Sequence, residues 1–106
     1  MTEYEITVSN RQDGSAVAAV VNDVCMQEGL VLQMKTSLKK YPGCTHWHFK
    51  RPDARGIVEV TWWPEATEKS ASRLWLSIHG NRQADWTFEL MPKLKALIER
   101  QLSVSP

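Results

Sequence analysis

The chain has few of the features that place a small protein in a class. Its 106 residues contain two cysteines, Cys25 and Cys44, which are too few for a disulfide framework. Cys25 also falls among the apolar positions of a predicted helix, so both residues are expected to be free thiols. No apolar stretch approaches the length of a membrane span, and residues 1–5 carry no basic leader. We therefore expect a cytoplasmic protein with no membrane partner.

An excess of charge and the common catalytic signatures are also missing. Thirteen Lys and Arg against 12 Asp and Glu leave a formal net charge of +1, so the whole molecule has no field that attracts nucleic acid or an anionic membrane. The sequence contains no phosphate-binding glycine loop, no nucleophile elbow and no calcium-binding EF-hand loop. These absences predict no cofactor, and they leave function to a local patch of the surface.

The composition present is that of a globular protein. Hydrophobic residues make up 42% and charged residues 24% of the chain, and no repeat, low-complexity tract or linker divides it. This length is common for one domain and suffices for one hydrophobic core. We therefore expect residues 1–106 to form a single domain.

Hydrophobic periodicity predicts five strands and two helices. The strands are expected at residues 3–9, from residue 30 onwards, and at 45–50, 57–63 and 73–79; the helices are expected at 15–28 and from Pro92 to about 102, with Pro92 in or before the first turn. The order β-α-β-β-β-β-α indicates an α+β two-layer sandwich, with two helices on one face of an antiparallel sheet. The sheet has four or five strands, because the pattern leaves open whether residues 30–38 pair with the others.

Strand alternation divides the three central strands into two faces. One face is almost wholly apolar and is expected to be the core under the helices: Trp47, Phe49, Val58, Val60, Trp62, Leu74, Leu76 and Ile78. The opposite face is polar but carries two tryptophans: His46, His48, Lys50, Glu59, Thr61, Trp63, Arg73, Trp75, Ser77 and His79. With both helices on the first face, the second is expected to be open to solvent.

The polar face contains the candidate chemistry. His46 and His48 form a His-x-His pair on one side of a strand, a spacing that lets two imidazoles reach one metal ion, and His79 offers a third ligand. A single pair of this kind is a weak signal, and Cys44 lies too far along the strand to join it. Glu59 is expected either to act as a general base, to orient an imidazole, or to serve as a cross-strand ion-pair partner. The sequence therefore leaves metal binding open.

Basic and aromatic side chains supply the other candidates. Four basic residues, together with His79, are expected at one end of the sheet, where they either hold a phosphate or carboxylate or are simply solvated: Lys50, Arg51, Arg55 and Arg82. Lys39 and Lys40 are expected at the opposite end. Trp63 and Trp75 either stack on each other, form a stacking platform, or form a homodimer contact.

Two functions follow from this surface. The first is a binding or interaction module in which the polar face engages a protein partner, a second copy of the chain, or single-stranded nucleic acid. The alternative is a small zinc-dependent hydrolytic enzyme, in which His46, His48 and His79 hold the ion and Glu59 carries the proton. A third, structural possibility is a surface inside a larger complex. No catalytic residue is assigned by the sequence alone.

Overall fold

The protein is an α+β sandwich, seen here in a computed structural model that describes residues 1–8, 13–64 and 72–104. Its elements are β1 (Thr2–Ile6), α1 (Gly14–Gln27), β2 (Val31–Thr36), β3 (Thr45–Lys50), β4 (Val58–Trp63), β5 (Arg73–Ile78), the short 3-10 helix η1 (Gly80–Arg82) and α2 (Asp85–Val104). The predicted fold class and element order are confirmed.

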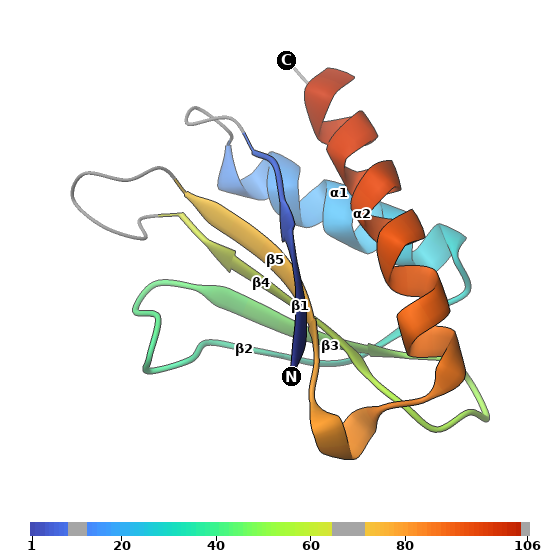
Figure 1. The fold of residues 1–106 in the computed structure, drawn as a ribbon. Helices are drawn as coiled ribbons and strands as arrows, with labels where there is room; N and C mark the ends of the chain where they lie inside the picture. The colour runs from blue at the N-terminus through green and yellow to red at the C-terminus, as the bar shows by residue number, and fades with distance from the viewer. Residues whose placement is uncertain (9–12, 65–71, 105–106) are drawn as a thin grey trace.

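The five strands form one antiparallel sheet in the order β1-β5-β4-β3-β2. Both helices lie on the same face of this sheet (Figure 1). β2 pairs with β3 at one edge, which settles the open question about residues 30–38: residues 31–36 are a sheet strand. None of the described helices is long and apolar enough to cross a membrane.

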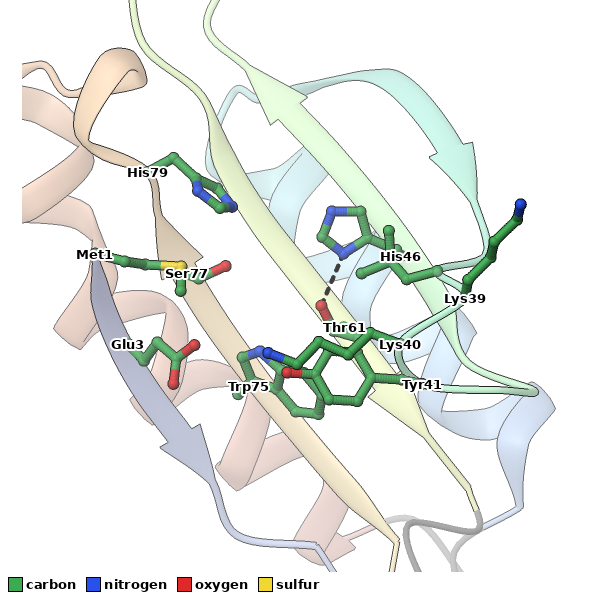
Figure 2. Close-up of a pocket in the computed structure, with 11 residues that line it drawn as sticks. Met1, Glu3, Lys39, Lys40, Tyr41, His46, Thr61, Trp75, Ser77 and His79 are labelled. Atoms are coloured by element: carbon green, nitrogen blue, oxygen red, sulfur yellow. Dashed lines mark hydrogen bonds between the residues drawn. The ribbon is translucent and has the colours of Figure 1, made fainter.

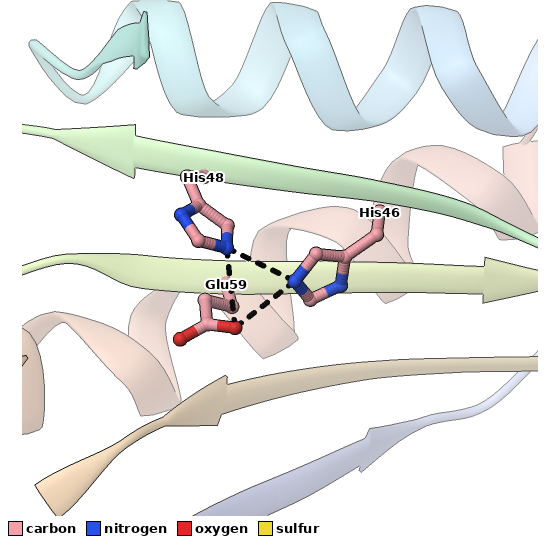
Figure 3. A group of neighbouring side chains, drawn as sticks. All are labelled: His46, His48 and Glu59. Atoms are coloured by element: carbon pink, nitrogen blue, oxygen red, sulfur yellow. Dashed lines mark hydrogen bonds and ion pairs between the residues drawn. The ribbon is translucent and has the colours of Figure 1, made fainter. Parts of the chain in front are cut away.

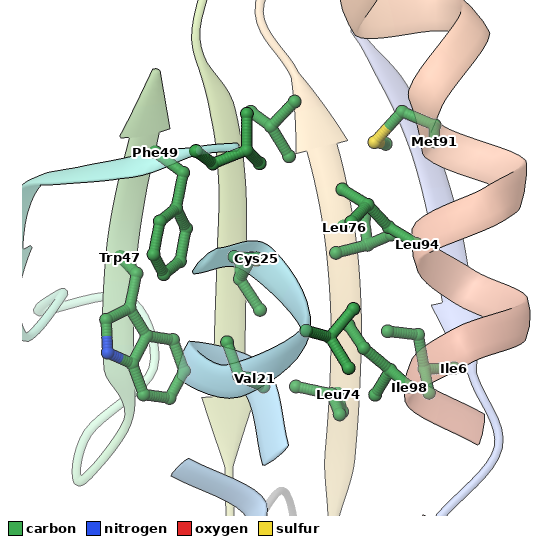
Figure 4. Close-up of a cluster of buried hydrophobic side chains, with 14 of the residues drawn as sticks. Ile6, Val21, Cys25, Trp47, Phe49, Leu74, Leu76, Met91, Leu94 and Ile98 are labelled. Carbon is green, nitrogen blue, oxygen red and sulfur yellow. The ribbon is translucent and has the colours of Figure 1, made fainter. Parts of the chain in front are cut away.

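The hydrophobic core fills the space between the helices and the sheet (Figure 4). All eight residues of the predicted apolar face are buried, and the valines of α1 and the leucines and isoleucine of α2 pack onto them. Trp47 is fully buried and Trp62 is 4% exposed, so both are structural residues as expected. Cys25 is buried in the same core, and both cysteines are free.

The ends of α1 follow from local chemistry. The Asp13 carboxylate accepts a hydrogen bond from the Ser15 backbone N–H at 3.0 Å, which caps the first turn. Gly29 adopts a φ of 79°, and the following Leu30 N–H donates to the Cys25 carbonyl. The predicted helix, residues 15–28, therefore agrees with α1 to within one residue at each end.

The start of α2 was predicted wrongly. The helix begins at Asp85, and Pro92 lies inside it instead of in or before its first turn. The longer helix is explained by the burial of Trp86, Leu90 and Met91. This burial offsets the loss of the hydrogen bond that proline cannot donate. Pro92 and Phe88 both lie on the exposed side, where the Phe88 carbonyl that loses its donor can bond to water.

The first strand is shorter than predicted. β1 ends at Ile6, because the Thr7 N–H leaves the sheet and donates to the Glu99 carboxylate of α2 at 2.7 Å. Residue 9, which was included in the predicted strand, lies outside the described residues, as do residues 65–71 of the link between the strands predicted at 57–63 and 73–79. The boundaries of the three central strands agree with the prediction to within one residue.

The turn between β3 and β4 is packed against the start of α2. Gly56 has a φ of 105°, and a Cβ atom at this position would lie 2.8 Å from the Cβ of Ala84. The backbone of this turn is also hydrogen-bonded to α2, because the Trp86 indole N–H donates to the Arg55 carbonyl at 2.6 Å. Close backbone approach here therefore requires glycine.

We predict that Gly56→Ala lowers the free energy of unfolding by about 2 to 4 kcal/mol, because it combines left-handed strain with a steric clash. Gly43→Ala is the matched control: its φ is 83°, but a Cβ there meets no atom within 4 Å. This variant should lose only about 1 kcal/mol. Urea unfolding of both variants measures the difference, and equal losses would show that the turn is not closely packed.

Candidate functional site

Most of the polar face of the sheet is not open to solvent, which corrects the prediction from alternation. His46 is 5% exposed, His48 7%, Glu59 2% and Trp75 3%. The helices do lie on the other face, so a different part of the chain must cover this one. The loop of residues 37–44 between β2 and β3 covers the part with His46 and Trp75 (Figure 2), and His79 and Arg82 contact Glu59.

Four hydrogen bonds hold this covering loop in place. The Tyr41 N–H donates to the Leu38 carbonyl, and the Cys44 N–H donates to the Tyr41 carbonyl. Each of these bonds closes a tight turn. The Leu38 N–H donates to the Cys44 sulfur at 3.3 Å, and the Trp63 indole N–H donates to the Pro42 carbonyl at 2.9 Å. The loop is therefore tied both to itself and to the end of β4.

Tyr41 fixes the loop onto the sheet through its ring. It makes edge contacts with Trp63 and Trp75, with ring centroids 4.9 and 5.1 Å apart. Trp63 is paired with Arg73 across the strands, and Trp75 with Thr61. The two tryptophans, which were considered as a stacked pair, thus share Tyr41 as their ring partner.

The loop leaves a pocket of about 310 Å³ on this face (Figure 2). Its floor is the sheet, with β3, β4 and β5 contributing His46, Thr61, Trp75 and Ser77. Met1 and Glu3 border one side and the covering loop borders the other, with His79 at the end of β5. The complete lining is Met1, Glu3, Leu38, Lys39, Lys40, Tyr41, His46, Thr61, Trp75, Ser77 and His79.

A cluster of ionisable side chains lies at the His46 side of this pocket (Figure 3). Glu59 Oε1 is 3.0 Å from His46 Nε2 and 3.3 Å from His48 Nε2, and these two nitrogens are 3.1 Å apart. β3 supplies both histidines on one face, and β4 places Glu59 directly opposite His48. Antiparallel register therefore brings together three side chains that can ligate a metal ion, all of them buried.

Hydrogen bonds alone do not satisfy this triangle of atoms. Each Nε2 carries at most one proton, so if both donate to Glu59, the two nitrogens lie 3.1 Å apart with no hydrogen bond between them. If one nitrogen is unprotonated, its lone pair faces either the carboxylate or the other ring without a proton between them. A cation at the centre would satisfy all three atoms, since ligands about 2.0 to 2.1 Å from a tetrahedral zinc ion lie roughly 3.3 Å from each other.

The remaining nitrogen of each imidazole has a partner as well. His46 Nδ1 is 2.8 Å from the Thr61 hydroxyl, which can accept its proton; in that tautomer Nε2 would bind a cation in place of its hydrogen bond to Glu59. His48 Nδ1 is 3.4 Å from Arg82 Nη1, which can only donate. His46 is thus set for ligation, whereas His48 must lose this long contact to Arg82 before its Nε2 can bind a cation.

The electrostatics favour the charge states that a metal site needs. Burial lowers the pKa of His48 despite the opposing effect of Glu59. Burial would raise the pKa of Glu59, but the hydrogen bond from His46 and the charges of His48 and His79 hold it below its usual value. A neutral imidazole and an ionised carboxylate are the ligating forms of these groups.

His79 and Arg82 complete the surroundings of Glu59. His79 Nε2 is 3.2 Å from Glu59 Oε1, and its side chain is 46% exposed at the pocket. Arg82 Nη1 is 3.5 Å from the other carboxylate oxygen. The fold therefore brings together His46, His48, Glu59, His79 and Arg82.

The other basic candidates have different surroundings. The Arg51 guanidinium lies 4.9 Å from the ring centre of Trp86, whereas Arg82 reaches Glu59 on the pocket face. Arg55 is exposed and Lys50 is half-buried. Lys39 and Lys40, which were not counted among the candidate residues, line the pocket. The Pro42–Gly43 turn marks the loop that carries them, but no pattern shows which way the loop folds.

Comparison of the chain with protein-family models, with curated proteins and with solved structures gave no match. Functional inference therefore depends on the geometry of the pocket and of the cluster beside it.

We predict that Tyr41→Ala lowers the free energy of unfolding by about 1 to 3 kcal/mol through the loss of two aromatic contacts. The variant should also make tryptophan fluorescence more accessible to acrylamide, because the loop no longer covers Trp75. Tyr41→Phe keeps the ring and is expected to behave like the natural chain in both measurements. Unchanged quenching in Tyr41→Ala would show that Tyr41 does not hold the loop down.

Proposed function

We propose that this protein binds a divalent transition-metal ion through His46, His48 and Glu59 and is a small metal-dependent hydrolytic enzyme. The observation that carries this proposal is the convergence of three ligating atoms, all within 4.8 Å of one another, beside a pocket. Two histidines and a glutamate form one of the ligand sets of catalytic zinc, in which a coordination position stays open for water or substrate.

We assign two residues roles other than those expected from the sequence. Glu59 is 2% exposed and touches both histidines, so it acts as a ligand instead of as a proton carrier. His79 is half-exposed, lines the pocket and lies 3.2 Å from Glu59. This position suits a group that exchanges protons with water and substrate, because such a group must reach both.

The proposed reaction is hydrolysis of an acyl or phosphoryl bond in a small substrate. Water supplies the oxygen that bonds to the substrate carbon or phosphorus, and its proton passes to the His79 imidazole. The bond to the leaving group then breaks, and the leaving group takes the proton from His79. The metal ion would lower the pKa of the water and polarise the substrate oxygen.

We predict that the purified protein binds Zn²⁺ or Co²⁺ at one site per chain, as measured by isothermal titration and elemental analysis. His48→Ala and Glu59→Gln should each weaken binding at least about 100-fold, because each removes a ligand. His79→Ala is the matched histidine control and should change the affinity less than about tenfold. Arg82→Gln should strengthen binding, since it removes a nearby positive charge that faces His48.

Several results would contradict this proposal. Failure of the natural chain to take up any divalent metal would end it, and so would unchanged affinity in His48→Ala. Circular dichroism of each variant separates loss of a ligand from loss of the fold. Hydrolysis of p-nitrophenyl acetate by the zinc-loaded protein should fall in His79→Ala while the zinc stays bound, which distinguishes a proton carrier from a fourth ligand.

An interaction function has separate support from the sheet edge. Every residue of β2 is exposed, including Val31 at 44%, Leu32 at 42% and Met34 at 41%. β2 is also an edge strand, so its outer backbone groups are free to pair with another strand. This arrangement favours association of two copies through β2, instead of through the tryptophans and histidines of the covered face.

For this second candidate we predict that the double variant Leu32→Ser, Met34→Ser weakens self-association at least tenfold, as measured by native mass spectrometry and light scattering. Met26→Ser is the matched control, because Met26 is 67% exposed but lies on α1. A natural chain that stays monomeric at high concentration would exclude the dimer.

A further inference from the structure

The pocket beside the histidine cluster carries a second chemical feature, the two adjacent lysines of the covering loop. Lys39 and Lys40 both line the pocket, and neither forms an ion pair with a carboxylate in the described part of the chain. Most surface lysines are simply solvated. These two differ because the loop that carries them is fixed at several points.

The loop holds both lysines at the edge of the pocket, although their side chains are exposed to solvent. Its turns close at Leu38, Tyr41 and Cys44, and the Trp63 indole N–H anchors it at Pro42. The Lys40 ammonium also lies 5.5 Å from the centre of the Tyr41 ring, a ring that packs against Trp63 and Trp75. The segment that carries the two positive charges is therefore fixed at the pocket.

The rest of the lining defines what these charges can recognise. Leu38, Tyr41, Trp75 and Met1 offer apolar and aromatic surface, and Thr61 and Ser77 offer hydroxyl groups on the floor. Glu3 is the carboxylate of the lining itself, while Glu59 is bound by histidines beneath it. A volume of about 310 Å³ is at the small end of ligand pockets.

We propose that the substrate is a small molecule with an anionic oxygen group, a carboxylate or a phosphate, which Lys39 and Lys40 bind while its apolar body lies against Tyr41 and Trp75. This inference rests on the proposed function for the reacting end, which faces His46 and His79. Lysine ammonium groups bind such anions as point charges without strict geometry, which is why the two anions are taken together.

The experiment uses three probes of similar size: benzoate, phenyl phosphate and the neutral benzyl alcohol. Each is titrated calorimetrically into the full chain, with and without zinc. We expect both anions to bind at least about tenfold more tightly than benzyl alcohol. The variant Lys39→Gln, Lys40→Gln should remove most of this preference and leave the alcohol unchanged. Lys35→Gln, an exposed lysine on β2, is the matched control and should keep the preference.

The outcomes separate the two sources of the anion and the two proposals. A preference for phenyl phosphate assigns a phosphate group, and a preference for benzoate assigns a carboxylate. Equal affinity for the anions and the alcohol, no binding of any probe, or the same loss in Lys35→Gln would overturn the inference. If zinc does not bind but a lysine-dependent anion preference persists, the metal function fails and the anion site remains. If zinc binds but the lysine-dependent anion preference is absent, the anion site fails and the metal function remains.

Discussion

The structure depends on one constraint: the three central strands are buried on both faces. On one side the helices cover an apolar surface, which is the usual arrangement in an α+β sandwich. On the other side the strands present His46, His48, Glu59, Thr61 and Ser77, all of which are buried. A polar surface loses its hydration when it is covered, so each of these groups needs a partner within the protein. The histidine and glutamate cluster meets this need for the most strongly charged of them.

The cost of burying Glu59 explains why so many groups surround it. An isolated buried carboxylate is strongly unfavourable, and a cluster of imidazoles with an arginine makes the ionised form acceptable. Yet the contacts among His46, His48 and Glu59 cannot all be hydrogen bonds at once, because three atoms form three close pairs with at most two protons between them. The cluster has more close contacts than protons to bridge them. This surplus, together with the adjacent pocket, distinguishes it from an ordinary buried salt bridge.

Much of the fold could be predicted because it depends on local patterns. Alternation located β3, β4 and β5 and identified the core residues, and helical periodicity placed α1 to within one residue at each end. The pattern failed where tertiary contacts set the ends of the elements. β1 ends where the Thr7 N–H bonds to Glu99, and α2 begins before Pro92 because Trp86 is buried. His46, His48 and Glu59 were identified as candidates, but their distances depend on strand register, which the sequence does not state. The loop beside His46 could not be foreseen, because the path of residues 37–44 is fixed by the contacts of Tyr41 with two distant tryptophans.

The two free thiols differ in a way that follows from the covering loop. Cys25 is fully buried in the core, and burial raises its pKa to about 12, so it reacts only when the core unfolds. Cys44 is 5% exposed, and its sulfur accepts a hydrogen bond from Leu38 within the loop. Movement of the loop alone would uncover Cys44 and leave Cys25 protected. The chain thus contains its own chemical reporter, in which alkylation of one sulfur records opening of the pocket and alkylation of the other records global unfolding.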